Sequence, residues 1–561
     1  DVCRFTFASS RSLLLQIDSL AEFLACLEMR TVLGRHLHLL TDEKARIWVV
    51  LSFAAVAVGS VLRALRYLDA PAVWLDEALL AINILEKPLA DIFGPLLYLQ
   101  SAPPGFLLVE EGAESLLGDA EWSLRLPPFL ASLAALLLFA YVCRQMLAPA
   151  AAALGTLLFA TAEPLLLRTA EIKHYSVDVM VTTLLLALYC WIRAAPPERS
   201  RRRIVALAVV APACLWFSFP AIFTLAAVVA ALALLGWQRQ SRASMVSATV
   251  LGPLALAMFG VVYAVAAGNA GRVSASIFGS GDPELAVGRL KTVENAWWTL
   301  INPGGFQNET AALAALLSGL AVIALARTPT LDRLALLTVP LVLAAAADAV
   351  HRYPLGGRFS LFLVPLLLLL AARGAQALVG WSRRPLVVGV GVVLFLAAAP
   401  AALAAYHLLE PPARSDVKPL LRYLADGWRR GDALYVYPDS QYQLRYYSQC
   451  EDCSISAADF PWPTRLSPPS SPREQYAPAL ESVPPSVIVG STSDPEAPVG
   501  DLDGVSPSSR LWLLFSTDTR SHDGRDDRVT LLEALGQNRK LLEERRARGA
   551  WLYLFDRQRA P

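Results

Sequence analysis

Long apolar windows recur through the first 406 residues of the chain and then stop. A helix needs roughly 17 to 25 mostly apolar residues to cross about 30 Å of hydrocarbon, which is close to the length of these windows. Because backbone facing lipid must satisfy its own hydrogen bonds, each window is expected to be helical. The pattern predicts about eleven transmembrane helices, near residues 47–66, 123–143, 148–167, 175–193, 204–218, 220–237, 246–267, 311–326, 332–348, 359–373 and 385–406.

From residue 411 onward prolines, charges and turns return, and the apolar runs shrink to strand length. Four short runs predict buried strands, and two longer amphipathic stretches predict helices. The strands are expected at 433–437, 487–490, 511–515 and 551–555, the helices at 416–430 and 529–548, and a Pro- and Ser-rich loop at 459–485. Residues 411–561 are therefore predicted to form an α/β domain outside the membrane.

The composition agrees with a membrane protein, since 55% of the 561 residues are hydrophobic, 17% are charged, and the mean hydropathy is +0.45. A net charge of +1, without a basic stripe, argues against nucleic acid as a partner. Basic residues gather in alternate loops, and such loops are normally cytoplasmic. This places residues 1–46 in the cytoplasm. Residues 47–406 form the membrane domain, and its loops 69–122 and 268–310 lie on the outer side. Met29 is an alternative start, in which case residues 1–28 are not native.

Two adjacent carboxylates, Asp76 and Glu77, follow the first predicted span and begin a helical run. An acid at the start of a helix can simply complement the helix dipole. Two acids at the rim of a bilayer, with further charged clusters nearby in the same topology, favour a chemical role.

A second charged cluster extends from Arg168 to Asp178, at the outer end of two predicted spans. If the segment is helical, Glu171, His174, Tyr175 and Asp178 share one face. Charged groups in a membrane are costly, so the acids should face protein or water. Rim charges that reach toward water explain Arg168 and Lys173 but not these acids.

A third cluster, His351 to Arg358, contains Pro354 and two glycines that predict a tight turn. Such a turn can direct backbone N–H groups and two guanidinium groups at an anion. A lipid phosphate has the charge and the depth that this position requires.

Three further motifs each have a structural and a functional interpretation. Trp297-Trp298 predicts an interfacial anchor, or a platform under a lipid or sugar. The region 435–447, with Asp439, Tyr442, Arg445 and Tyr446, predicts structural strand residues or sugar-binding groups. Cys450 and Cys453 have redox or zinc spacing, but a second ligand pair is missing. An oxidising compartment favours a local disulfide, with a reduced pair as the alternative.

Five motifs follow one another in the chain: Trp74-Leu-Asp-Glu-Ala, Gln100-Ser-Ala-Pro-Pro-Gly-Phe, Glu121-Trp-Ser-Leu-Arg-Leu-Pro-Pro, Glu171-Ile-Lys-His-Tyr-Ser, and Arg352-Tyr-Pro with Arg358. In this order, over about residues 45–406, they resemble the bacterial C-type (GT-C, family 39-like) glycosyltransferases of the protein mannosyltransferase and aminoarabinose transferase kind. Each motif is weak alone, and together they are fairly specific for the superfamily but not for the substrate.

The resemblance implies a GT-C fold and an enzyme that transfers a sugar from a polyprenyl-phosphate-linked donor, with inversion, at the outer face of the bacterial cytoplasmic (inner) membrane. The acid of the first outer loop maps onto Asp76, with Glu77 beside it. A carboxylate there can take the proton of the acceptor hydroxyl as it attacks. Glu171 resembles the second outer acid of the family.

Fixed cations near the departing phosphate would lower the barrier. The candidates are Lys173, His174, Arg352 and Arg358, and the candidate substrate-binding residues are Tyr175, Tyr353 and His351. No His/Cys cluster demands a metal, so none is expected, with a divalent cation as the alternative. The expected partners of this monomer are the lipid-linked donor and a lipid, glycan or protein acceptor. The sugar and the acceptor stay open.

Two other classes of protein compete with this hypothesis. A lipid or solute transporter or flippase also carries charges inside the membrane. Transporters usually contain internal repeats, and the hydrophobic segments of this sequence show none. A receptor whose outer domain senses a ligand would leave the acidic first loop unexplained.

Overall fold

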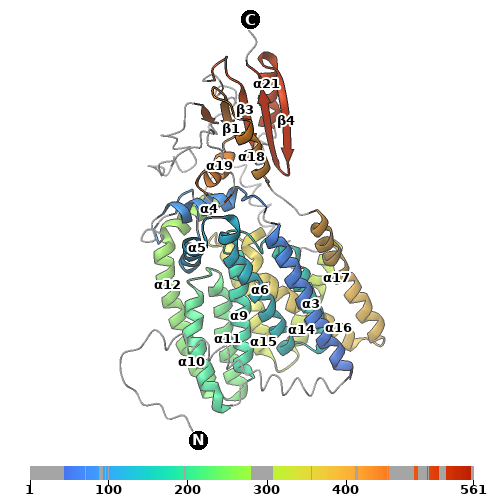
Figure 1. Cartoon of the computed structure of the whole chain (residues 1–561). Coiled ribbons are helices and arrows are strands. Elements are labelled where there is room, and N and C mark those ends of the chain that lie inside the picture. Colours follow the sequence, from blue (N-terminus) through green and yellow to red (C-terminus); the bar gives the residue numbers. More distant parts are fainter. Residues whose placement is uncertain are drawn as a thin grey trace.

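The computed structural model describes residues 43–557, except 70, 88–92, 95, 99, 195–196, 279–307, 356, 411–414, 451–452, 454–485, 491–501, 503–504 and 517–525. Within this part the chain forms a helical body with a smaller sheet domain at one end (Figure 1). The Trp297-Trp298 motif and most of the predicted loop 268–310 lie outside the described residues, as does nearly all of the segment 1–46.

Each predicted apolar window is helical in the structure. The window at 148–167 is divided into two helices, and the window at 359–373 begins with a 3-10 turn. The helices of the body are α3 (Glu43–Leu68), α6 (Glu121–Met146), α7 (Pro149–Thr161), α8 (Glu163–Leu167), α9 (Tyr175–Arg193), α10 (Pro197–Cys214), α11 (Ala221–Arg239), α12 (Arg242–Phe278), α14 (Asn308–Ala326), α15 (Leu331–Ala349), η2 (Gly357–Leu363), α16 (Val364–Trp381) and α17 (Pro385–Leu409).

Seven helices in the described part are long and apolar enough to cross a membrane: α3, α6, α9, α11, α12, α16 with η2, and α17. The chain is therefore a multi-pass membrane protein. The other predicted spans are shorter or more polar. For example, α7 has 13 residues and extends only about 20 Å. It ends where the chain turns into α8.

Two residues illustrate how closely the helices of the body pack: the small Gly374 and the fully buried Arg63. A Cβ atom on Gly374 of α16 would lie 1.8 Å from the carbonyl oxygen of Leu317 in α14, so a larger residue would separate these helices. Arg63 of α3 is fully buried and donates to the carbonyls of Phe159 and Ala160, at 3.3 and 3.1 Å. These carbonyls belong to the last turn of α7, where a cation complements the helix dipole.

Two helices, α4 (Leu75–Glu86) and α5 (Pro104–Leu117), lie between the helical body and the sheet domain (Figure 1). The helical run predicted to begin at Asp76 and Glu77 is thus confirmed. The Pro-Pro-Gly motif begins α5, because Pro104 occupies its first turn. The N–H of Gly105 donates to the carbonyl of Trp216 at 2.7 Å. A Cβ on Gly105 would lie 2.8 Å from that oxygen, so only glycine allows this contact.

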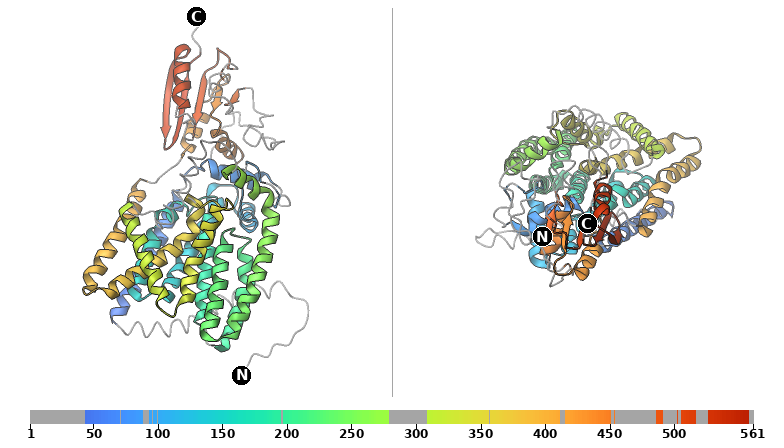
Figure 2. Two further views of the ribbon diagram at one scale, coloured as in Figure 1. Left: turned by 180° about the vertical axis from the view of Figure 1, so that it is seen from behind. Right: turned by 90° about the horizontal axis from the view of Figure 1, so that it is seen from above.

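In its described residues the sheet domain contains five strands, in the order β2-β1-β3-β5-β4 (Figures 1 and 2). Strands β1, β2 and β3 are parallel, and β5 pairs antiparallel with both β3 and β4. Its elements are α18 (Lys418–Gly427), β1 (Ala433–Val436), α19 (Ser440–Gln449), β2 (Val487–Val489), β3 (Leu511–Phe515), α21 (Asp527–Asn538), β4 (Leu541–Ala547) and β5 (Ala550–Phe555). All four predicted strands are present, and Cys450 and Cys453 form the expected disulfide.

Two predictions for this domain are wrong. The helix expected at 529–548 ends at Asn538, and β4 follows it as an exposed strand that pairs with β5. In the tyrosine-rich region 435–447, Tyr435 and Val436 belong to β1, but the residues from Ser440 onward form helix α19, which packs against α4, and not a strand. In both cases pairing or packing with a distant segment overrides the local pattern.

Candidate active site

Asp76 lies in the first turn of α4 and forms ion pairs with two cations from distant parts of the chain. Its Oδ1 is 3.2 Å from Nζ of Lys173, which lies between α8 and α9. Its Oδ2 is 2.5 Å from Nη1 of Arg358, the second residue of η2. The structure therefore brings the first outer loop, the second cluster and the third cluster together at one carboxylate.

Lys173 and Arg358 are both held by further contacts. Nζ of Lys173, which is almost fully buried, donates to Oε1 of Gln100 at 2.5 Å. The guanidinium of Arg358 lies 5.6 Å from the ring centre of Trp74 and 5.7 Å from that of Tyr175. Cation–π contacts of this kind orient an arginine without neutralising it. Both side chains are thus held in place beside Asp76.

Burial and charge oppose each other at this site. Burial raises the pKa of Asp76, but Lys173 and Arg358 together lower it more, so the pKa lies below its usual value and the carboxylate is ionised at neutral pH. Burial lowers the pKa of Lys173, and Asp76 offsets part of this effect. Burial, and then Lys173, lowers the pKa of His174 to about 3. The imidazole of His174 is therefore neutral, and it can contribute hydrogen bonds but no charge to a phosphate site.

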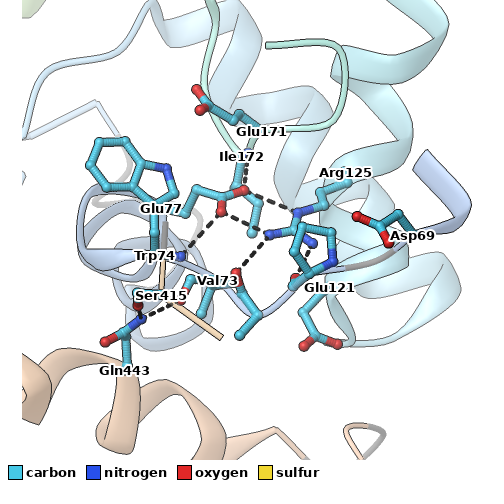
Figure 3. Close-up of polar contacts among 12 residues, drawn as sticks. Asp69, Val73, Trp74, Glu77, Glu121, Arg125, Glu171, Ile172, Ser415 and Gln443 are labelled. Carbon is cyan, nitrogen blue, oxygen red and sulfur yellow. Dashed lines mark hydrogen bonds and ion pairs between the residues drawn. The ribbon is translucent and has the colours of Figure 1, made fainter. Parts of the chain in front are cut away.

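Glu77 has a different environment from its neighbour (Figure 3). Its Oε1 accepts hydrogen bonds from Nε of Arg125 at 3.0 Å and from the backbone N–H of Ile172 at 2.9 Å. Its Oε2 accepts from Nη2 of Arg125 at 2.8 Å and from the N–H of Trp74 at 3.2 Å. The ion pair is buried, with 1% and 2% of the two side chains exposed. Glu77 thus ties α4 to α6 and to the segment before α9.

The segment that contains Glu171 is a turn, because α9 becomes helical only at Tyr175. Glu171 therefore does not share a helical face with Asp178, and it pairs with Arg168. His174 caps α9, and its Nε2 lies 3.7 Å from Oδ2 of Asp178. Tyr175 is buried beneath Arg358.

Only part of the third cluster reaches Asp76. His351 and Arg352 are exposed beyond the end of α15, whereas Arg358, six residues further on, reaches Asp76. The hydroxyl of Tyr353 donates to the carbonyl of Phe359 at 2.7 Å, which braces the turn before η2. Among the described contacts, none joins His351, Arg352 or Tyr353 to Asp76. The roles predicted for these three residues stay predictions.

Sequence reasoning gave no role to two residues that organise this site. Gln100 binds Lys173, and Arg125 binds Glu77. Both belong to motifs that carry the family resemblance, so the signal was present, but their partners are 73 and 48 residues away. A small cavity adjoins the site, lined by Arg63, Ser132, Ala135, Phe159, Leu165, Arg168, Tyr175, Ser176, Val179 and Leu361.

The described residues contain no group of three or more His, Cys, Asp or Glu side chains placed to hold a metal ion. At the site itself, both oxygens of Asp76 already face cations. Such a carboxylate, as it is arranged in this structure, does not fit a divalent cation ligand.

The central part of the chain, residues 101–263, matches the family described as dolichyl-phosphate-mannose-protein mannosyltransferase. The matched part includes Arg125, Glu171 and Lys173, whereas Asp76 and Arg358 lie outside it. No curated protein matches the chain significantly by sequence.

Two solved proteins have a similar fold. ArnT from Cupriavidus metallidurans, in the crystal structure bound to undecaprenyl phosphate, is 13% identical, with 90% of this chain and 98% of that chain covered and a TM-score of 0.47. The Archaeoglobus fulgidus oligosaccharyltransferase, in the complex with Zn and sulfate, is 11% identical, with 90% and 73% covered and a TM-score of 0.48. With TM-scores below 0.5, neither likeness carries a further argument. The family match confirms the predicted resemblance to membrane glycosyltransferases of the GT-C kind.

Proposed function

We propose that this protein is a membrane glycosyltransferase that moves a sugar from a polyprenyl-phosphate-linked donor to an acceptor hydroxyl, with inversion at the anomeric carbon. The observation that carries the proposal is the contact of Asp76 with both Lys173 and Arg358. An acid and two cations at one point supply the groups that attack by a hydroxyl and departure of a phosphate require. The family match to mannosyltransferases that use dolichyl phosphate mannose supports the same class of donor.

In the proposed reaction the acceptor oxygen attacks the anomeric carbon while Asp76 takes the hydroxyl proton. A new glycosidic C–O bond forms as the bond between the sugar and the phosphate oxygen breaks. The polyprenyl phosphate leaves with the bonding electrons. Its growing negative charge is stabilised by Lys173 and Arg358, which already have fixed positions, so little reorganisation is needed.

The two cations give Asp76 a second property. Without donor they hold the Asp76 carboxylate ionised and weakly basic. A donor phosphate competes with Asp76 for the same ammonium and guanidinium groups. Binding of the donor therefore frees the carboxylate and raises its basicity at the moment when the acceptor needs a base. We propose that the ion pairs seen here are the resting state of the site.

We further propose that the site opens at the extracytoplasmic face of a bacterial cytoplasmic membrane. Asp76 belongs to α4, and this helix lies at the end of the helical body next to the sheet domain (Figure 1). Basic residues gather at the other end, where Arg239 donates to the carbonyl of Arg193 at 3.0 Å and Arg333 to that of Met146 at 3.3 Å. A basic end is normally cytoplasmic.

The acceptor is proposed to be a lipid, a glycan or a protein, with the chain acting as a monomer. Mass spectrometry of envelope glycans and lipids from cells with and without the gene would identify the product. Addition of EDTA to the purified enzyme would test metal dependence. We expect activity to persist, since the cations of the site are supplied by side chains.

The substitution Asp76→Asn tests the function. It removes the base but keeps the shape of the side chain, so transfer should fall by about 10²- to 10⁴-fold while donor lipid still binds. The matched control is Asp69→Asn, an exposed acid of the same loop that pairs with Arg66 at 3.3 Å and should keep full activity. If Asp76→Asn still transfers sugar, or if the wild-type protein only translocates the lipid, the proposal is wrong.

A further inference from the structure

Helix α19 of the sheet domain binds the segment that leads into α4. The hydroxyl of Tyr447 accepts a hydrogen bond from the N–H of Val73 at 3.0 Å. The side-chain amide of Gln443 donates to the carbonyl of the same residue at 2.6 Å. Figure 3 shows Gln443 beside Val73, below the Glu77 network. Val73 lies three residues before Asp76. Both its backbone N–H and its backbone carbonyl are therefore held by α19, a helix of the other domain.

The same helix also binds the other end of α4. Nε of Arg445 donates to Oε1 of Glu86, the last residue of α4, at 2.6 Å, and Nε2 of Gln449 donates to the same oxygen at 2.6 Å. Residues 443 and 447 are one turn apart in α19, and so are residues 445 and 449. Positions two residues apart lie about 200° apart around a helix, so opposite flanks of α19 hold the two ends of α4. The side chain of Arg445 is 1% exposed, so this contact is shielded from water.

A second path leads from α19 to Lys173. Nη1 of Arg445 donates to the hydroxyl of Tyr98 at 2.6 Å, and the side chain of Gln100 donates to the Tyr98 carbonyl at 3.2 Å. Gln100 in turn accepts from Nζ of Lys173 at 2.5 Å. Tyr98 has a φ of 58°, a left-handed conformation that costs energy for a residue other than glycine. Contacts on both its hydroxyl and its carbonyl hold it in that conformation.

We propose that α19 is a positioning element of the active site, which sets where Asp76 and Lys173 lie relative to each other. Gln443 and Tyr447 position Asp76 through Val73, and Arg445 positions Lys173 through Tyr98 and Gln100. The sheet domain is then part of the catalytic unit, beyond any role in acceptor choice. This inference rests on the proposed function, because it assigns to α19 the placing of the proposed base.

The test compares two tyrosine substitutions in the same domain. Tyr447→Phe removes the acceptor for the Val73 N–H, while Glu121, its other partner, keeps its ion pair with Lys418 at 3.0 Å. Tyr423→Phe is the control, since the Tyr423 hydroxyl contacts Glu543 and Arg545 within the domain. Misplacement of a reacting group by about 1 Å costs about 10²-fold. We therefore expect Tyr447→Phe to lower kcat by about 10- to 100-fold, with little change in KM for the donor, and Tyr423→Phe to keep the wild-type kcat.

A second readout does not depend on turnover. Hydrogen exchange measured by mass spectrometry should be faster at the Val73–Trp74 amides in Tyr447→Phe than in the wild type, and unchanged there in Tyr423→Phe. If Tyr447→Phe does not fold, Gln443→Met serves in its place, because it deletes the donor to the Val73 carbonyl. A purely structural role would reduce the yield of folded protein but leave kcat per folded molecule unchanged, and that result would overturn the inference.

The two proposals fail in different ways. If Asp76→Asn keeps its activity, the proposed function is wrong whatever Tyr447→Phe does. If Asp76→Asn is inactive and Tyr447→Phe turns over like the wild type with unchanged exchange at Val73, only the role of α19 is wrong.

Discussion

Glu77→Gln tests whether the second carboxylate of the acidic pair is structural. The glutamine keeps one oxygen, which can accept two of the four hydrogen bonds that Glu77 now receives. Its NH₂ group replaces the other oxygen and faces two N–H donors. Arg125, buried and without its carboxylate, becomes an uncompensated charge. Breaking a buried ion pair in this way costs about 3–5 kcal/mol.

That loss corresponds to a fall of about two to four orders of magnitude in the ratio of folded to unfolded protein. Unfolding of purified protein in detergent, by heat or denaturant, would measure it. The double variant Glu77→Gln with Arg125→Met removes both charges, so it should be more stable than Glu77→Gln alone. Asp69→Asn, a change in the same loop at an exposed position, should unfold like the wild type.

The reasoning is refuted if Glu77→Gln unfolds like the wild type and yet has no transferase activity. Glu77 would then be a reacting group, and the choice of Asp76 as the base would have to be reversed.

Three further predictions concern pH and the membrane helices. Because the ion pairs lower the pKa of Asp76, its carboxyl group should stay ionised, and keep its contribution to stability, until the pH falls below the ordinary pKa of 3.8. The acid limb of kcat/KM should lie below this pH or be hidden by unfolding. Burial lowers the pKa of Lys173, so the ammonium group loses its proton below the ordinary pKa of 10.5. The alkaline limb of kcat/KM should therefore lie below pH 10.5 and move to higher pH in Lys173→Arg. An unmoved limb would exclude Lys173 as its source. Arg63→Leu should lower thermal stability, because two carbonyls at the end of α7 lose their donor and each buried unpaired group costs about 1–3 kcal/mol; wild-type stability would contradict the role of Arg63.

The sequence predicted the helical body well because the membrane leaves the backbone few alternatives. An apolar window of sufficient length must become a helix, so the bounds of α9 agree with the predicted 175–193. The sequence also predicted that the clusters containing Asp76, Lys173 and Arg358 lie at the ends of spans on one side, but not that Asp76 pairs with both cations. Charge that is costly near lipid needs a partner.

The errors come from interactions that no local pattern contains. The stretch Leu541–Ala547 is rich in Glu and Arg and favours a helix by itself, but pairing with β5 makes it a strand. His174 was expected to act as a cation, but its burial, which the sequence does not show, makes it neutral. The contacts of α19 with Val73 span more than 360 residues of sequence. They depend on how two domains pack, and spacing within either domain gives no sign of them.

Binding of a polyprenyl phosphate to the protein in nanodiscs tests the central claim most directly. Asp76 forms ion pairs with Lys173 and Arg358, the two cations that the lipid phosphate is proposed to bind. Asp76→Asn should therefore bind the lipid phosphate more tightly than the wild type although it no longer transfers sugar, whereas Arg358→Gln should bind it more weakly. Weaker binding by Asp76→Asn, or unchanged binding by Arg358→Gln, would contradict the claim that base and phosphate share this site.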